Sequence, residues 1–230
     1  MWASGRALFE DRRDAGQQLA GVLKGLALSD PIILALPRGG VPVAHEVAMA
    51  LHAPLDLMLV RKLGAPGHSE YGIGAITDGA NPRTVFNEDA VAFLRPSPAY
   101  IEAETKRQLE ELERRRRAYL GGRPPPDLAG RTVVLVDDGI ATGGTVKAAL
   151  MGLRDMDVKR LVLAVPVAPA SAIVEMRQLA DDVVCLATPE PFLAVGQHYR
   201  DFSQTTDEEV VSLLRSATGY PEDREVRAED

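Results

Sequence analysis

The chain has 230 residues, of which 26 are Lys or Arg and 33 are Asp or Glu, giving a formal net charge of −7. This acidic balance argues against non-specific nucleic-acid binding, which depends on neutralising phosphates, and the single cysteine, Cys185, excludes an internal disulfide framework. No apolar run approaches the roughly 20 residues of a membrane span and the N-terminus carries no secretory signal pattern, so we expect a cytoplasmic protein that binds neither membrane nor nucleic acid.

The hydrophobic pattern predicts an α/β domain. A first helix is expected from Asp11 onward, because apolar residues recur at helical spacing as far as Leu26. The expected strands are residues 32–36, 55–60, 133–136, 161–165 and 183–186. The expected helices between them are residues 43–51, 145–153 and 169–179. Apolar runs without alternation suit strands buried on both faces, which predicts a mostly parallel central sheet with helices on both faces.

Residues 64–130 interrupt this alternation of strands and helices. Two short β-like runs, residues 71–77 and 83–86, flank the turn sequence Asp78-Gly79-Ala80-Asn81 and predict a hairpin. Asn87 is placed to cap a short helix that follows it. This segment is therefore interpreted as an insertion made of a hairpin and helices.

A long charged helix is predicted at residues 100–119. Its apolar stripe consists of Ile101, Leu109, Leu112 and Tyr119. This pattern favours a solvated helix packed on one side over a coiled-coil partner helix. Four consecutive arginines at 114–117 spread around the helix and complement its C-terminal dipole, so they do not form a nucleic-acid-binding stripe. Residues 217–230 are polar and charged and are predicted to be a disordered tail.

The most informative stretch, residues 133–145, reads VVLVDDGIATGGT. A buried strand delivers two adjacent carboxylates, Asp137 and Asp138, and a loop rich in Gly and Thr follows before a helix. The N–H groups of such a loop and the positive end of the helix dipole suit a phosphate. Carboxylates repel a phosphate, so their natural partners are hydroxyls or a metal ion. The unbroken order of strand, acids, loop and helix favours a sugar-phosphate site over strand-end solvation or helix capping.

This stretch resembles the ribose-phosphate binding motif of the type I phosphoribosyltransferases, whose donor substrate is phosphoribosyl pyrophosphate (PRPP). The resemblance covers a domain of residues 9–202 and implies the fold of that family. It implies that Asp137 and Asp138 bind the ribose hydroxyls and take part in catalysis. The residues that it implies for the 5-phosphate are Ala141, Thr142, Gly143, Gly144 and Thr145.

The first two strands carry further parts of the resemblance. The turn Arg38-Gly39-Gly40 is similar to the family's pyrophosphate loop. In that loop the glycines would let the backbone approach the ligand closely, and Arg38 would contribute positive charge. Arg61 and Lys62, at the end of the second predicted strand, resemble the Arg-Lys stretch of adenine-type members. The resemblance thus implies that Arg38 and Lys62 bind PRPP and act in catalysis. From the residues alone, a plain tight turn and a solvated basic pair are the alternatives.

The lid and the acceptor side follow from the same resemblance. Residues 64–130 would form a lid hairpin and a helical insertion, with the hairpin in the position of the family's flexible catalytic loop. Residues 187–205 resemble the hood of purine-type members, and Phe192 would stack on the base, although core packing is an equal alternative. Ala141 stands where members that use 6-oxopurines carry an acid. Adenine-type members carry alanine there, but the hood has no further adenine feature, so the acceptor stays open.

The resemblance implies a pentosyltransferase that moves a 5-phosphoribosyl group from PRPP to a small nitrogenous base, such as a purine, and releases pyrophosphate. Mg²⁺ is the implied cofactor, held mainly by PRPP, with Asp137 as the one candidate protein ligand. The alternative is a regulatory protein that senses PRPP or a nucleotide without turnover, and the lid and Lys62 favour the enzyme. The resemblance leaves a homodimer open, and the role of the helix at 100–119 is not assigned.

Overall fold

A five-stranded parallel sheet lies at the centre of the computed structural model, which describes residues 7–78 and 82–217. The strand order is β2-β1-β6-β7-β8. These strands are β1 (Pro31–Ala35), β2 (Leu55–Leu57), β6 (Thr132–Val136), β7 (Arg160–Val167) and β8 (Asp182–Ala187). All four neighbouring pairs are parallel, which confirms the predicted sheet.

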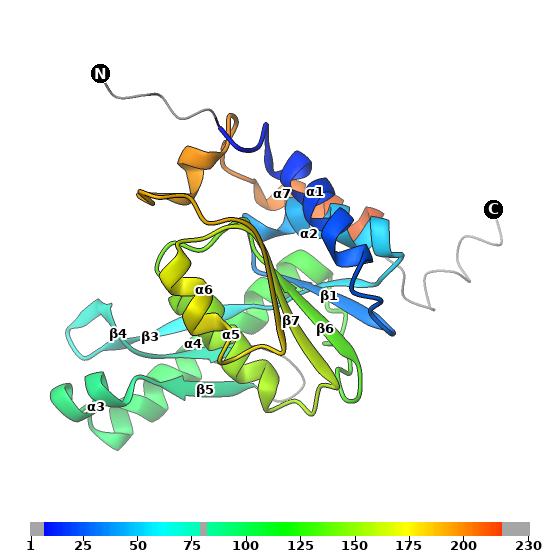
Figure 1. Cartoon of the computed structure of the whole chain (residues 1–230). Helices are drawn as coiled ribbons and strands as arrows, with labels where there is room; N and C mark the ends of the chain where they lie inside the picture. Colours follow the sequence, from blue (N-terminus) through cyan, green and yellow to red (C-terminus); the bar gives the residue numbers. More distant parts are fainter. Residues whose placement is uncertain (1–6, 79–81, 218–230) are drawn as a thin grey trace.

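Helices cover both faces of the parallel sheet (Figure 1). These helices are α1 (Arg12–Lys24), α2 (Gly40–Leu51), α5 (Gly144–Arg154), α6 (Ala170–Met176) and α7 (Asp207–Ser216). Successive residues of β1 face opposite sides. Ile33 belongs to a core shared with α1, α2 and α7, whereas Ile32 belongs to a second core shared with α5 and α6. Both faces are apolar, which is why the strands appear in the sequence as unbroken apolar runs.

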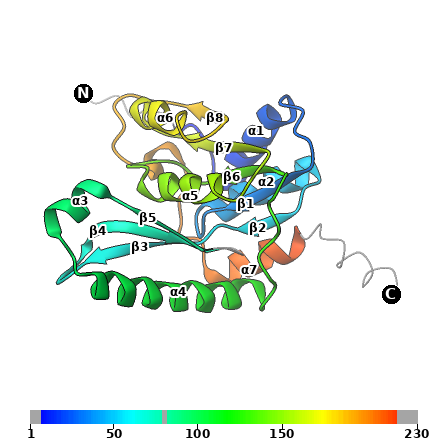
Figure 2. The same ribbon diagram turned by 90° about the horizontal axis from the view of Figure 1, so that it is seen from below.

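A second sheet, antiparallel and in the order β3-β4-β5, lies beside the first. It consists of β3 (Val60–Ala65), β4 (His68–Thr77) and β5 (Arg83–Phe86). In Figure 2 the long helix α4 (Pro98–Leu120) covers one face of this sheet and α5 covers the other. The pairing of β4 with β5 confirms the predicted hairpin, although its turn at 79–81 lies outside the described residues. Buried Leu63, Ile73 and Ile76 join the sheet to the main core.

The insertion also contains the short helix α3 (Glu88–Leu94). The Asn87 side chain accepts a hydrogen bond from the Ala90 N–H at 3.2 Å, which confirms the predicted cap. None of the helices in the two described ranges is long and apolar enough to cross a membrane.

The second predicted strand, residues 55–60, is wrong as a single strand. β2 ends at Leu57, and β3 begins at Val60 in the other sheet, so Lys62 lies on an antiparallel strand. The exchange occurs at Leu59, whose N–H donates to the Asp78 carboxylate at 2.7 Å and whose carbonyl accepts from the Asp78 N–H at 2.9 Å. Since the residues at the junction are buried as well, the apolar run does not reveal where the chain changes sheets.

Helix α4 matches the prediction in position but differs from it in its buried face. Its most buried side chains are Glu104, Gln108, Leu112 and Arg116, spaced four residues apart. Of the predicted apolar stripe only Leu112 is fully buried, and the other three members are half-buried. Arg116, one of the four arginines predicted to spread around the helix, is thus buried on its packed face.

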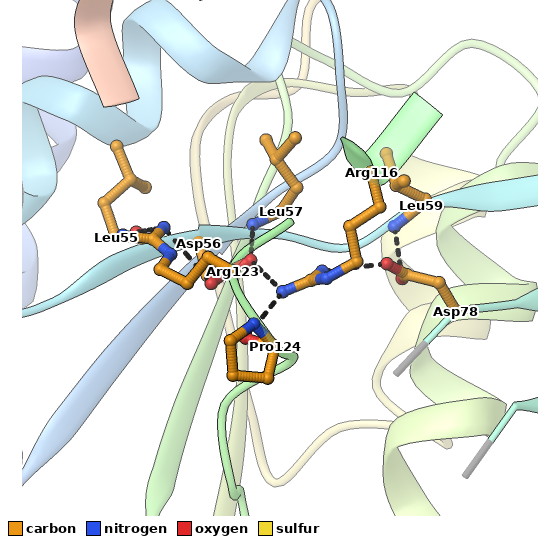
Figure 3. A network of polar contacts seen from close by, with 8 residues as sticks. All are labelled: Leu55, Asp56, Leu57, Leu59, Asp78, Arg116, Arg123 and Pro124. Atoms are coloured by element: carbon orange, nitrogen blue, oxygen red, sulfur yellow. Dashed lines mark hydrogen bonds and ion pairs between the residues drawn. The ribbon is translucent and has the colours of Figure 1, made fainter. Parts of the chain in front are cut away.

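Arg116 belongs to a buried polar network that joins α4 to both sheets (Figure 3). Its guanidinium donates to Asp56 of β2 at 3.0 Å, to Asp78 at 2.9 Å and to the Pro124 carbonyl at 3.3 Å. Arg123 donates to the other oxygen of Asp56 at 3.3 Å. Burial raises the pKa of Asp78 to about 6, against the opposing effect of the Arg116 charge. The network ties the inserted helix to the body of the domain.

Helix α7 is absent from the sequence-based prediction. The Thr206 hydroxyl caps it by accepting from the Glu209 N–H at 3.1 Å, its first turn is acidic, and Val210 and Leu214 are buried. These are ordinary signals of a short amphipathic helix. Of the tail predicted at 217–230, all but Ala217 lies outside the described residues.

Candidate active site

The acidic pair, Asp137 and Asp138, directly follows β6 at the carboxyl edge of the parallel sheet, where ligands of open α/β sheets bind. The Asp138 N–H donates to the Asp137 carboxylate at 2.9 Å. Burial raises the pKa of both carboxyls, and the charge of Asp138 raises the pKa of Asp137 further. Two acids held side by side in this way suit a ligand that donates hydrogen bonds or carries positive charge.

Arg12, the first residue of α1, reaches this acidic pair. Its Nε donates to Oδ2 of Asp138 at 2.8 Å, and Nη1 donates to the Ser203 carbonyl at 2.8 Å. Its Cζ lies 3.9 Å from the centroid of the Phe202 ring. The guanidinium lowers the pKa of Asp138 against the larger effect of burial. Nothing in the sequence marks Arg12 as part of the site, because it lies 126 positions from Asp138 and stands among other charged residues.

The glycine turn, residues 37–40, packs against the acidic pair. Strands β1 and β6 are neighbours, so their following loops meet at one edge. A Cβ atom at Gly39 would lie 2.1 Å from Oδ2 of Asp138, and one at Gly40 would lie 2.8 Å from the Val136 carbonyl oxygen. At Gly40 the clash is with backbone and only glycine fits, whereas at Gly39 a side chain would displace the Asp138 carboxylate. The contact joins the two loops that the sequence singled out.

The Gly-Thr loop, residues 141–145, connects the acidic pair to α5. Ile140 anchors its start, since its side chain is buried and its N–H donates to the Val167 carbonyl at 2.9 Å. Gly143 is the N-cap residue, with φ of 78° and no side-chain cap hydrogen bond, while Thr142 and Thr145 are exposed. An uncapped helix start with two exposed hydroxyls is a suitable anion site.

Lys62 and Arg38 are placed differently. Lys62 lines a cavity of about 700 Å³ together with Thr142, Gly144 and Thr145, so the structure brings it to the Gly-Thr loop. The guanidinium of Arg38 lies 3.6 Å from the Asp207 carboxylate. Arg38 lines a separate cavity of about 760 Å³ between α4 and α7. The predicted pairing of Arg38 with Lys62 around one ligand therefore requires Arg38 to turn.

The hood, residues 187–205, lies beside the segment that precedes α1, since Phe9 forms a parallel bridge with Tyr199. Phe192 is half-buried, contacts the small apolar cluster of Phe9, Val167 and Tyr199, and lies 5.1 Å from the His198 ring between centroids. It thus packs against the core while part of its surface stays exposed. Stacking of Phe192 on a base stays a prediction.

A metal ion at this site would need oxygen atoms from a bound phosphorylated molecule as well as from the protein. Among the residues that the structure describes, no group of three or more His, Cys, Asp and Glu side chains could hold a metal. Asp137 and Asp138 place two carboxylates beside the glycine turn, and Glu88 and Asp89 line the cavity that Lys62 shares with the Gly-Thr loop. Mg²⁺ commonly binds through one or two carboxylates together with substrate phosphates, so this donor set fits an ion that arrives with a phosphorylated ligand.

Comparisons with known proteins agree with the geometry. Residues 11–200 match the family described as "Phosphoribosyl transferase domain". The chain is 49% identical over 210 residues to "Putative phosphoribosyl transferase MT0597" and to "Putative phosphoribosyl transferase Rv0571c", both of Mycobacterium tuberculosis. These matches cover 91% of this chain and 47% of each relative, so the chain spans about half the length of the curated relatives. The crystal structure of TT1426 from Thermus thermophilus is 44% identical, with a TM-score of 0.79 over 91% of this chain and 99% of that one.

Proposed function

The chain belongs to the phosphoribosyl transferase domain family, and from this premise we propose that it transfers a 5-phosphoribosyl group from PRPP to a nitrogenous base and releases pyrophosphate. One observation carries the proposal: the acidic pair lies between the glycine turn and the Gly-Thr loop. A sugar with vicinal hydroxyls, a terminal phosphate and a diphosphate has one group for each of these three parts.

In this proposal each part of the site binds one part of PRPP. The ribose hydroxyls donate to Asp137 and Asp138. The 5-phosphate accepts hydrogen bonds from the N–H groups of the Gly-Thr loop and from the hydroxyls of Thr142 and Thr145. The diphosphate lies along the glycine turn, where the absence of side chains at 39 and 40 leaves the backbone accessible.

The reaction forms a bond between the acceptor nitrogen and C1 of the ribose. The bond between C1 and the diphosphate oxygen breaks, its electron pair leaves with pyrophosphate, and the acceptor nitrogen loses a proton. Positive charge develops on the ribose, beside the carboxylates of the acidic pair, while negative charge grows on the diphosphate. Lys62 lines the cavity at the Gly-Thr loop, and in this proposal its side chain extends from there to stabilise the diphosphate. Arg38 contributes there once it exchanges Asp207 for the diphosphate. When bound, Mg²⁺ supplies further neutralisation of the leaving charge, held by the phosphates and Asp137.

The double variant Asp137→Asn/Asp138→Asn tests this proposal. Each hydrogen bond to a charged group contributes about 1.5–3 kcal/mol, so PRPP binding with Mg²⁺, measured by isothermal titration calorimetry, should weaken by at least about 100-fold. The matched control is Asp181→Asn/Asp182→Asn, a second adjacent acidic pair at the start of β8. Equal affinity in the wild type and the first variant would contradict the proposal.

Pyrophosphate release across a panel of bases separates the enzyme from the sensor. An enzyme releases pyrophosphate from PRPP with at least one base, and the productive base identifies the acceptor. A protein that binds PRPP tightly but releases pyrophosphate with none of the bases is the regulatory alternative. A wild type that does not bind PRPP at all would refute both.

A further inference from the structure

We propose that Arg12 is a positioning residue, which holds the Asp138 carboxylate in the orientation that binds the ribose hydroxyl. This inference rests on the proposed function, because it assigns a role toward the same ligand. Arg12 does not contact the ligand in this proposal. It acts through Asp138, which it binds from the side of α1 and the hood.

Three contacts fix the Arg12 guanidinium from three directions. They are the ion pair with Oδ2 of Asp138 at 2.8 Å, the hydrogen bond to the Ser203 carbonyl at 2.8 Å, and the Phe202 ring at 3.9 Å. The Arg12 side chain is 12% exposed, whereas that of its neighbour Arg13 is 72% exposed. An exposed ion pair is mobile and contributes little. A guanidinium that is withdrawn from water and stacked on a ring has one orientation, and it imposes that orientation on its partner.

Asp138 needs such a partner because it is crowded by like charge and by backbone. Asp137 is the adjacent residue, and its carboxylate accepts the Asp138 N–H. The glycine turn lies so close that no Cβ fits at Gly39 beside Oδ2. Since Oδ2 is engaged by Arg12, we assign Oδ1 of Asp138 to the ribose hydroxyl.

The hood supports the same arrangement through Tyr199. Its hydroxyl donates to the Asp138 carbonyl oxygen at 2.5 Å, and its ring lies 5.0 Å from that of Phe202 and 5.3 Å from that of Phe9. Asp138 is therefore held by its main chain through Tyr199 and by its side chain through Arg12. The N-terminal helix and the hood thereby reach a carboxylate that belongs to the central sheet.

Two probes separate positioning from a general effect on stability. Ribose 5-phosphate carries the vicinal hydroxyls and the phosphate, whereas inorganic phosphate engages only the Gly-Thr loop. Arg12→Met should weaken ribose 5-phosphate binding by at least about 10-fold, because the ribose hydroxyl loses its hydrogen bond to the Asp138 carboxylate. The same variant should leave phosphate binding within twofold. Arg12→Lys, which keeps the charge but loses the planar fork, should be intermediate. Arg13→Met, the matched control on the same turn, should bind both probes as the wild type does.

A double-mutant cycle with Asp138→Asn tests whether Arg12 acts through that residue. In the Asp138→Asn background, the further change Arg12→Met should weaken ribose 5-phosphate binding by less than twofold. Additive losses, or equal losses of both probes, would overturn the inference. Should Arg12→Met fail to fold, Arg12→Lys decides alone: wild-type affinity for ribose 5-phosphate is the overturning result.

The outcomes also separate this inference from the proposed function. If the wild type binds ribose 5-phosphate and the cycle is non-additive, but no base gives pyrophosphate, the positioning role stands and the transferase proposal fails. If the wild type turns over PRPP while Arg12→Met keeps its KM for PRPP, the positioning role fails alone. A wild type that binds neither ribose 5-phosphate nor PRPP refutes both.

Discussion

Replacement of Gly39 by alanine tests whether the close approach of the two loops is required for PRPP binding. The added methyl group would lie 2.1 Å from Oδ2 and 2.7 Å from Cγ of Asp138. Non-bonded heavy atoms are normally separated by roughly 3.5–4.0 Å, so the methyl and the carboxylate must move apart by more than about 1 Å. The carboxylate does not yield freely, because Arg12 holds the same oxygen at 2.8 Å.

The expected loss comes from this contact and not from backbone strain. Gly39 has φ of −59° and ψ of −35°, which alanine adopts without cost. A displaced carboxylate loses its hydrogen bond to the ribose hydroxyl, and a hydrogen bond to a charged group contributes about 1.5–3 kcal/mol. PRPP binding should therefore weaken by roughly 10- to 150-fold.

The assay is calorimetric titration with PRPP and Mg²⁺, with thermal unfolding of each variant alongside. Gly21→Ala is the matched control, since a Cβ there meets nothing within 4 Å and the residue lies within α1. It should bind PRPP like the wild type and unfold at a slightly higher temperature. Affinity of Gly39→Ala within twofold of the wild type would refute the argument from close approach.

Three further variants test catalysis and the buried network. Lys62→Ala should lower kcat/KM for pyrophosphate release by several hundred-fold, since one preorganised donor contributes about 3–4 kcal/mol to the barrier, and near-wild-type turnover would exclude the assigned role. Arg116→Met leaves Asp56 and Asp78 buried beside each other and should cost about 3–5 kcal/mol in denaturant unfolding, whereas the exposed Arg117→Met should cost little. Burial raises the pKa of Asp78 from 3.8 to about 6, so the folded protein keeps a proton that the unfolded chain has released. The unfolding free energy should therefore fall by up to about 3 kcal/mol as the pH rises from about 4 to 6. Asp78→Asn should remove that part of the pH dependence, and an unchanged slope would contradict it.

The acidic pair and the Gly-Thr loop could be found from the sequence because their chemistry is local. Strand, acids, glycines and helix follow one another within thirteen consecutive residues, 133–145, so their order predicts a candidate anion site at a sheet edge. The same holds for the cap at Asn87, since its side chain bonds to an N–H three residues away. Parallel strands could also be recognised, because burial on both faces leaves continuous apolar runs.

Other parts of the molecule depend on contacts between distant segments. The run at 55–60 changes sheets at Leu59 without any change in hydrophobicity, because both sheets bury it. Arg116 is one of four identical neighbours, and only the positions of Asp56 and Asp78 make it the buried one. A helical pattern specifies which residues share a face, but not which partner covers that face.

The sequence by itself therefore determined the α/β class, the sheet edge that carries the site and the residues that follow β6. The tertiary structure alone decided that Gly39 touches Asp138, that Arg12 reaches the same carboxylate, and that Arg38 turns toward Asp207. The physical reason is the range of the interactions. Hydrogen bonds and helix dipoles within one segment follow from neighbouring residues. The ion pair between Arg12 and Asp138, which are 126 positions apart, forms only after the chain has folded and placed α1 beside the end of β6.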